Sequence, residues 1–301
     1  MGTEVKVTLW ASDAEQGQQA INDVMTEMRR IDQTFSPYIE TSELARVNQF
    51  AAQHPVTVSP ELAKLLQRSL YYSDLSQGAF DITFASVGWF YDYRQHQQPT
   101  TEQKKQLLSA INYHNLQFDA QKSTLRFSNE NVRIDLGGIA KGYAVDRAVE
   151  ILQKRGIKHA TVSAGGDSRL LGDKRGRPWL IGIKNPRPSE TQPQDVVLTM
   201  PLDDVAVSTS GDYERFFIDE KTGQRVHHIM NPKTGDSARE LMSVTILGPQ
   251  GMDTDALSTT VFVLGTQRGI DLINQLPQFD CVVIAADGKV HYSQGLMPPT
   301  Q

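Results

Sequence analysis

The residue types around position 255 could hold a divalent cation. Asp255, Ser258 and Thr259 stand at positions i, i+3 and i+4, so they would share one face of a helix. A carboxylate with two hydroxyls is a set of hard oxygen donors. Such a set suits Mg²⁺, because that ion takes few protein ligands and completes its shell with phosphate oxygens. The alternative is structural, because Asp253 or Thr254 could simply cap the start of that helix.

Three further segments, rich in glycine or hydroxyl side chains, could contact an anion. Residues 135–142 read Asp-Leu-Gly-Gly-Ile-Ala-Lys-Gly and are expected to join a strand to a helix. Glycines let a ligand approach the backbone, and amides at a helix start favour an anion. The segment is neither the GxGxxG of dinucleotide folds nor the GxxxxGKS/T of nucleotide hydrolases. Residues 163–167 (Ser-Ala-Gly-Gly-Asp) and 208–213 (Ser-Thr-Ser-Gly-Asp-Tyr) suit a phosphate or a ribose. Taken alone, residues 135–142 could equally be a tight turn, and for each of the other two segments a turn is the favoured interpretation over a site.

A histidine pair, His227 and His228, precedes a turn formed by Asn231-Pro232 and Thr234-Gly235. Neighbouring residues of a strand point to opposite faces, so the two rings are not expected to bind one metal ion. One of them as a general base beside the turn is the better interpretation.

Composition excludes several classes of protein. The 301 residues carry a formal net charge of −5, whereas a protein that binds DNA or an anionic membrane is usually basic. Cys281 is the one cysteine, so an internal disulfide and a cysteine metal cluster are excluded. No apolar run approaches the roughly 18 residues of a membrane-spanning helix.

Hydrophobic periodicity predicts the elements that must position these side chains. Strands are expected over 3–10, 132–136, 160–164, 179–184, 195–200, 204–208, 242–248, 281–286 and 289–293. Helices are expected after a cap at Ser12 or Asp13, after Ser59-Pro60, and over 101–111, 140–155, 254–264 and 267–275. Gly156 should end the helix over 140–155, Asp287-Gly288 should form a hairpin turn, and 85–100 should be a surface excursion. Helices and strands without strict alternation predict an α+β fold.

Nine motifs in a fixed order give the chain a family resemblance. They are 1–3 (MGT), 36–38 (SPY), 42–44 (SEL), 78–83 (GAFDIT), 135–146 (DLGGIAKGYAVD), 163–167 (SAGGD), 208–213 (STSGDY), 227–235 (HHIMNPKTG) and 254–265 (TDALSTTVFVLG). Together they span nearly the whole chain, which resembles the ApbE-like FAD:protein FMN transferases. The resemblance implies one domain over 1–301, with FAD in a cleft between two lobes of an α+β fold.

The resemblance also implies roles for particular residues. His228 matches the histidine proposed as the base. The residues expected to bind FAD are Met1, Tyr38, Ala79, Phe80, Asp81, Asp135, Lys141, Thr209, Ser210 and Ile229, with Met1 and Tyr38 on either side of the isoalloxazine ring. The expected metal ligands are the Gly138 carbonyl, Asp255 and Thr259, with Ser258 at a position that is sometimes a ligand. Asn231 departs from the family, which usually has an aspartate before this proline, and Ser163-Ala164 displaces the usual asparagine.

The expected reaction is Mg²⁺-dependent transfer of FMN from FAD to a threonine or serine hydroxyl of an acceptor protein, which releases AMP. Two alternatives remain: a Mg²⁺-dependent FAD pyrophosphatase that releases FMN and AMP, and a flavin-binding protein without catalysis. Retention of Tyr38 favours transfer over hydrolysis. The resemblance implies acceptors among flavin-carrying subunits of membrane redox complexes, such as sodium-translocating NADH:quinone reductase, and related reductase domains.

The compartment follows from the same resemblance. Relatives are usually exported, often with a lipidated cysteine ahead of the Met-Gly-Thr motif, and Met1 falls on that motif here. We therefore expect a periplasmic protein, anchored to the inner membrane as a lipoprotein in its full-length form, with the leader absent from this chain. A leaderless cytoplasmic member is the alternative.

Overall fold

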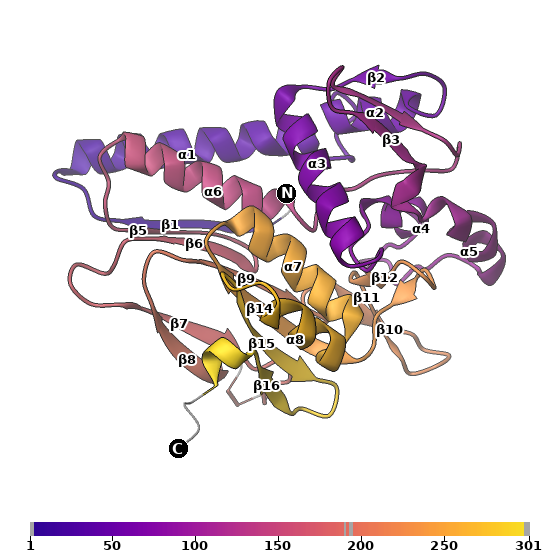
Figure 1. Cartoon of the computed structure of the whole chain (residues 1–301). Coiled ribbons are helices and arrows are strands. Elements are labelled where there is room, and N and C mark those ends of the chain that lie inside the picture. The colour runs from indigo at the N-terminus through magenta and orange to yellow at the C-terminus, as the bar shows by residue number, and fades with distance from the viewer. Residues whose placement is uncertain (1–2, 190, 193–194, 298–301) are drawn as a thin grey trace.

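A seven-stranded antiparallel sheet organises the protein (Figure 1). The computed structural model describes residues 3–189, 191–192 and 195–297. In spatial order the strands are β1 (Val5–Leu9), β5 (Ala160–Ala164), β6 (Asp167–Leu171), β9 (Ala206–Gly211), β14 (Leu241–Gly248), β15 (Asp280–Ala285) and β16 (Val290–Tyr292). The strand predicted over 3–10 is present as β1, which lies at one edge of the sheet. The mixed helices and strands confirm the α+β prediction.

Helices cover one face of this sheet, and a β-ribbon covers the other. The helices are α6 (Ala140–Lys154), α7 (Gly251–Leu264) and α8 (Thr266–Asn274), with α1 (Ala14–Phe35) packed on α6. The ribbon is made of β7 (Trp179–Lys184) and β8 (Val196–Leu202). Its inward side chains, such as Ile183 and Met200, pack on Val207 and Val282 of the sheet. Both faces of the sheet therefore carry apolar side chains that pack against a covering layer.

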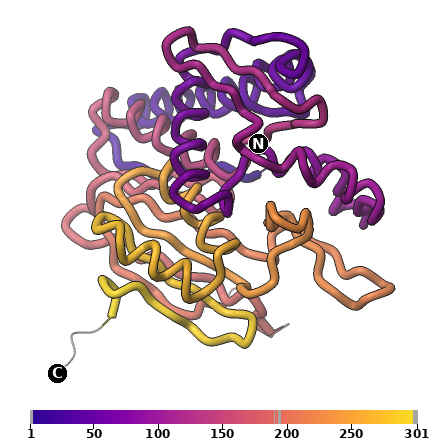
Figure 2. The backbone as a smooth tube through the Cα atoms, turned by 45° about the vertical axis from the view of Figure 1, so that its right-hand side comes forward, coloured from indigo at the N-terminus to yellow at the C-terminus, as the bar shows by residue number. Residues whose placement is uncertain are grey.

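Residues 36–131 form a helical region beside the sheet (Figure 2). Its elements are α2 (Glu43–Phe50), α3 (Pro60–Leu75), α4 (Ala85–Gly88), α5 (Thr101–Leu107) and a small sheet of β2 (Val56–Thr57), β4 (Thr124–Phe127) and β3 (Leu116–Asp119), with short 3₁₀ turns at Ile82–Phe84, Leu108–Ala110 and Tyr113–Asn115. Leu62 and Leu125 of this region share one apolar cluster with Val244 and Phe262 of the sheet and its helices.

Two short ribbons lie between these parts of the fold. They are β10 (Phe216–Ile218) with β11 (Arg225–His227), and β12 (Met230–Asn231) with β13 (Asp236–Ser237); a last 3₁₀ turn spans Gln294–Leu296. The long β10–β11 connection projects in orange on the same side as α5 in Figure 2. Gln98, which precedes α5, donates to Asp219 of this connection at 2.9 Å, and Lys104 of α5 pairs with Asp236 of β13 at 2.6 Å.

Most predicted helix boundaries are confirmed. Asp13 caps α1 by accepting from the Gln16 amide at 2.8 Å, and Ser59 caps α3 ahead of Pro60. Gly156 follows α6 with a φ of 78°, in the left-handed region that ends helices at little cost for glycine. The region 101–111 is helical through Leu107 and continues as the 3₁₀ turn to Ala110.

Two of the predictions for 85–136 are wrong. Residues 132–136 form no strand, because their backbone groups bond elsewhere: the Asn48 amide pairs with Ile134 N and O, and the Ser86 hydroxyl accepts from Arg133 N. The predicted surface excursion begins with α4, of which Ala85–Val87 are buried; only the part after it is mostly exposed.

The expected cap of α7 by Asp253 or Thr254 is also wrong. The helix begins at Gly251, and Asp146 of α6 accepts from the amides of Gly251 and Met252 at 2.7 and 2.9 Å. The carboxylate that caps the helix is thus more than a hundred residues away in sequence. Within the described part of the chain, no helix is both long and apolar enough to cross a membrane.

Candidate functional site

The start of α6 and the first turns of α7 bring two buried carboxylates around one ammonium group. Lys141 Nζ lies 2.8 Å from the Gly137 carbonyl, 3.0 Å from Asp255 Oδ1 and 3.0 Å from Asp167 Oδ2. Burial opposes a charge there, but Asp167 and Asp255 outweigh it and raise the pKa of Lys141. Lys141 donates hydrogen bonds to the Gly137 carbonyl and to Asp255, and Asp167 adds an ion pair.

Asp255 lies in an electrostatically unfavourable place. Its side chain is 3% exposed, and burial followed by repulsion from Asp167 raises its pKa, although Lys141 and the Gly142 amide at 3.0 Å partly compensate. Two carboxylates facing one lysine leave an excess of negative charge. A cation bound at Asp255 would offset that excess.

The four predicted metal ligands lie close together. Thr259 is the one residue between 251 and 262 of α7 that is not buried. The Ser210 hydroxyl lies 2.8 Å from that of Ser258 and 3.4 Å from that of Thr259. A methyl group added to Gly138 would lie 3.3 Å from Thr259 Oγ1, which places the glycine-rich turn against the same face of α7.

The chemistry of these donors fits Mg²⁺. They are a carboxylate, hydroxyls and a backbone carbonyl, all hard oxygens. Over the described residues there is no group of three or more His, Cys, Asp or Glu side chains that could hold a metal ion. A metal at this site would therefore depend on the mixed donor set, with phosphate or water oxygens to complete it.

Strand β9 packs a row of hydroxyls against α7 and β14. The pairs Ser208–Thr254 and Thr209–Thr245 are each 2.8 Å apart. The segment 208–211 is therefore part of a strand, and the interpretation of it as a turn is wrong. Thr209 and Ser210, the two predicted FAD contacts here, are half-buried at the end of that strand.

The two histidines have different surroundings, as the sequence predicts. His227 is buried; its Nε2 donates to the Ala238 carbonyl at 2.7 Å, and its Nδ1 accepts from the Ile229 amide at 3.3 Å. Burial lowers the pKa of His227, so this ring is neutral and structural.

His228 is the ring with an unused nitrogen. It is half-buried, and its Nδ1 is enclosed without a hydrogen-bond partner among the described residues. Burial, with the positive charge of Arg215, lowers the pKa of His228 to about 3. A base with the ordinary pKa of about 6.5 was expected; the structure instead holds a neutral imidazole over the physiological range.

The predicted flavin contacts fall into two groups. Tyr38 is 71% exposed and stacks on Trp89, and half-buried Asp135 accepts from the Gly137 amide at 2.6 Å. Asp81, in contrast, is buried. Its carboxylate stabilises the local fold by accepting hydrogen bonds from the backbone amides of Thr83 and Tyr113, each at 2.8 Å. Burial raises the pKa of Asp81 and of Asp135. Ala79, Phe80 and Ile229 are buried. Met1 lies outside the described residues.

Three residues near the site were not singled out from the sequence. Asp167 ends the 163–167 segment, so its motif carried a signal that was not used. Arg215 is exposed, and its charge acts on Tyr38, Asp135 and His228. Trp89 follows α4 and carries no spacing pattern that indicates its contact with Tyr38.

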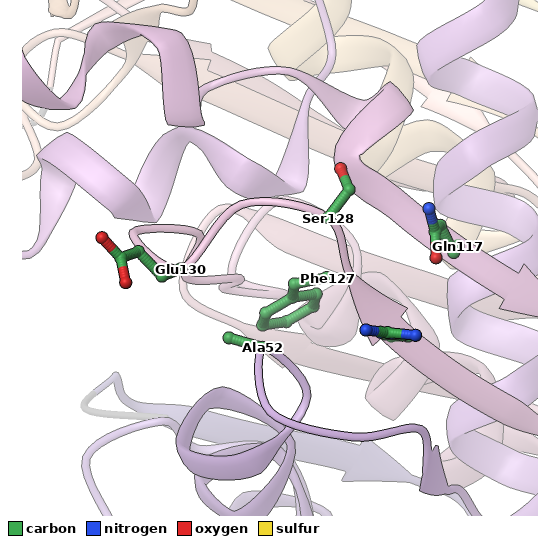
Figure 3. A pocket seen from close by; sticks show the side chains of 6 residues that line it. Ala52, Gln117, Phe127, Ser128 and Glu130 are labelled. Atoms are coloured by element: carbon green, nitrogen blue, oxygen red, sulfur yellow. The ribbon is translucent and has the colours of Figure 1, made fainter.

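A recess on the surface of the small sheet lies apart from this site. Figure 3 shows a recess of about 540 Å³ beside the small sheet, lined by Ala52, Gln117, Arg126, Phe127, Ser128 and Glu130. None of the predicted catalytic, flavin or metal residues lines it. The recess therefore provides no evidence that the predicted site binds a ligand.

Comparison with known proteins identifies the family. The family model described as "ApbE family" matches residues 1–283. The chain belongs to the ApbE family. Among curated proteins, this ApbE-family chain is 31% identical to an FAD:protein FMN transferase of Treponema pallidum, over 99% of this chain and 86% of that one. It is 33% identical to one of Haemophilus influenzae, over 81% of this chain and 72% of that one.

Solved structures share the ApbE fold. The ApbE protein of Thermotoga maritima has a TM-score of 0.88 and 34% identity, covering 98% of this chain and 94% of that one. Flavin transferase ApbE of Vibrio cholerae has a TM-score of 0.83 and 27% identity, with the same coverage. The α+β fold and the family resemblance predicted from the motifs are both confirmed.

Proposed function

We propose that this ApbE-family chain transfers the FMN moiety of FAD to a threonine or serine hydroxyl of an acceptor protein and releases AMP. One observation carries the proposal: the oxygen donors Asp255 and Thr259 lie on one face of α7, beside Lys141. The charge of Lys141 also acts on His228. The curated relatives named for this activity support it. Phosphoryl-group transfer depends mainly on positioning and charge neutralisation, which such a cluster can supply.

Mg²⁺ would be held by Asp255, Thr259 and the Gly138 carbonyl, with Ser258 adjacent. When bound, it would neutralise charge on the FAD pyrophosphate and on the departing AMP. Lys141 holds Asp255 against the Gly137–Gly138 turn, so it keeps two of these donors in register. The buried ammonium also adds positive potential where phosphate charge would develop.

His228 is the residue proposed to take the proton of the acceptor hydroxyl. The acceptor oxygen forms a bond to the FMN-side phosphorus, the bond from that phosphorus to the AMP oxygen breaks, and the hydroxyl proton passes to a ring nitrogen of His228. The low pKa of His228 keeps the ring unprotonated and ready to accept. A bound pyrophosphate would bring negative charge near the ring and raise its pKa toward a more useful range.

The finer assignments of partner and compartment are proposals as well. The acceptors would be flavin-carrying subunits of membrane redox complexes or related reductase domains, and the site of action would be the periplasm. Fractionation of cells that express the full reading frame tests the compartment.

Mass spectrometry of a candidate acceptor domain tests the reaction. The domain is incubated with the enzyme, FAD and Mg²⁺, and we expect an FMN adduct on one threonine or serine with one AMP released per adduct. Free FMN and AMP without an adduct would contradict transfer and indicate the pyrophosphatase. Bound FAD without AMP release would contradict both. A threonine-to-valine acceptor is the matched control.

A further inference from the structure

Three groups distant in sequence are stacked at the exposed side of the site. The rings of Tyr38 and Trp89 lie 5.2 Å apart, centroid to centroid, and are inclined by only 12°. The Arg133 guanidinium lies over the Trp89 ring, 4.9 Å from its centroid. Because Tyr38 is 71% exposed, the stack leaves much of its ring open to solvent.

Each member of the stack is held by its own backbone contacts. Trp89 ends α4, where its amide donates to the Ala85 carbonyl at 3.0 Å. Arg133 is fixed to the same helix, because its amide donates to the buried hydroxyl of Ser86 at 3.0 Å. Tyr38 follows α1 in a turn that Ser42 closes by donating to the Ser36 carbonyl at 2.7 Å.

The stack adjoins the proposed catalytic centre. Val87 of α4 packs with Met230 of β12, two residues beyond His228, and Figure 1 shows α4 beside β12. Arg215, whose backbone carbonyl accepts from the His228 amide at 3.2 Å, acts electrostatically on Tyr38. Arg215 is therefore a common neighbour of Tyr38 and His228.

We propose that Trp89 is a positioning residue for the flavin. It holds the Tyr38 ring by stacking, Arg133 holds Trp89 by a cation–π contact, and the isoalloxazine ring stacks on the open face of Tyr38. This inference rests on the proposed function, because the ligand it positions is the flavin of FAD. The physical reason is preorganisation: an exposed tyrosine that is already oriented loses less rotational freedom when a ligand binds.

If the stack positions the flavin, substitutions in it should weaken FAD binding rather than slow the chemical step. An aromatic pair of this kind is worth a factor of about 2 to 12 in an equilibrium constant beyond area burial. We expect Trp89→Leu to raise Kd and KM for FAD by about that factor and to leave kcat nearly unchanged. Trp89→Phe keeps a ring and should restore most of the affinity. Arg133→Met should weaken binding less, since it removes the outer contact only.

The experiment measures FAD affinity by titration calorimetry with EDTA and without acceptor, so that no turnover intervenes. Thermal melting of each variant is measured beside it. Phe90→Leu is the matched control: Phe90 is the next residue, is 39% exposed, and has no ring-stacking contact within the described part of the chain. Wild-type affinity in Phe90→Leu, with a weakened Trp89→Leu that Trp89→Phe rescues, is the expected result.

Other outcomes overturn the inference in distinguishable ways. If Tyr38→Ala weakens FAD binding but Trp89→Leu, Trp89→Phe and Arg133→Met do not, Trp89 does not position the flavin, while the proposed function stands. If Tyr38→Ala also binds FAD normally, the flavin does not lie on this stack at all. The transfer assay is scored separately: wild-type enzyme that binds FAD with the expected pattern but never modifies an acceptor would refute the proposed function alone.

Discussion

We predict that Asp255, a proposed metal ligand in the cluster with Lys141 and Asp167, lowers the stability of the fold when no metal is bound. Removal of one partner from an isolated buried ion pair typically costs about 3–5 kcal/mol, because a charge is left uncompensated. Here Asp255→Asn leaves Lys141 paired with Asp167, one ammonium with one carboxylate. The asparagine oxygen can still accept from the Gly142 amide. We therefore expect the free energy of unfolding without metal to change by less than about 1 kcal/mol or to rise.

Lys141→Met is the contrasting variant in the same cluster. It leaves Asp167 and Asp255 facing each other without a counter-charge, and the loss should be about 3–5 kcal/mol. For a chain of this length each kcal/mol moves Tm by about 2 °C. The two variants should therefore differ by roughly 6–10 °C in EDTA.

Addition of Mg²⁺ should make wild type clearly more stable than Asp255→Asn. A ligand at 100 times its Kd stabilises the folded state by about 2.7 kcal/mol, which is about 5 °C here. Wild type should gain that shift, and Asp255→Asn should gain almost none and lose transfer activity. Differential scanning fluorimetry with EDTA or MgCl₂ measures both effects. A loss of several kcal/mol in Asp255→Asn without metal, or a full Mg²⁺ shift in it, would refute the reasoning.

Other predictions test the packing of α6 and α7 and the role of His228. A methyl group added to Gly142 would lie 1.9 Å from the Gly251 carbonyl, so Gly142→Ala should lose at least about 2 kcal/mol in urea unfolding. Gly17→Ala, whose nearest contact would be 3.3 Å, should be neutral or gain up to about 1 kcal/mol from helix propensity. Asp146→Ala should cost about 1–2 kcal/mol in the same assay, because α7 loses its cap. Because the pKa of His228 in the free enzyme is lowered to about 3, kcat/KM for FAD, which reports the free enzyme, should show no inflection near pH 6.5 from this ring. His228→Ala should bind FAD normally and fail to modify the acceptor.

The sequence could predict the members of the site because each lies in a short pattern with a local meaning. Helical spacing placed Asp255, Ser258 and Thr259 on one face, and the structure brings Ser258 and Thr259 to the Ser210 hydroxyl. Strand geometry predicted different surroundings for His227 and His228, and the surroundings do differ, but His228 lies just beyond the end of β11 rather than within a strand. Periods of 3.6 and 2 residues are encoded locally, so a single sequence carries them.

The partners of these residues could not be predicted in the same way. Asp146 caps α7 from 105 residues away, and a search for a local cap therefore selected Asp253 or Thr254. Asn48 takes the hydrogen bonds of Ile134 across 86 residues, so 132–136 has the alternation of a strand without a ladder. Such contacts depend on the tertiary fold, which overrides local propensity.

The contacts around α7 explain how its proposed metal ligands could be positioned accurately enough for phosphoryl-group transfer. Helix α6 caps its first amides through Asp146 and lies so close at Gly142 that no side chain fits. Strand β9 pairs hydroxyls with it, and Arg68 of α3 pairs with Asp253 at 2.6 Å. Contacts from three separate elements thus fix the helix, and Thr259 is the one position between 251 and 262 that they leave partly open. Because an error of about 1 Å in a catalytic group can cost 100-fold in rate, a ligand helix held on several sides matters more than any single contact. Loosening α7 by Asp146→Ala should therefore lower the transfer rate by more than its cost in stability predicts.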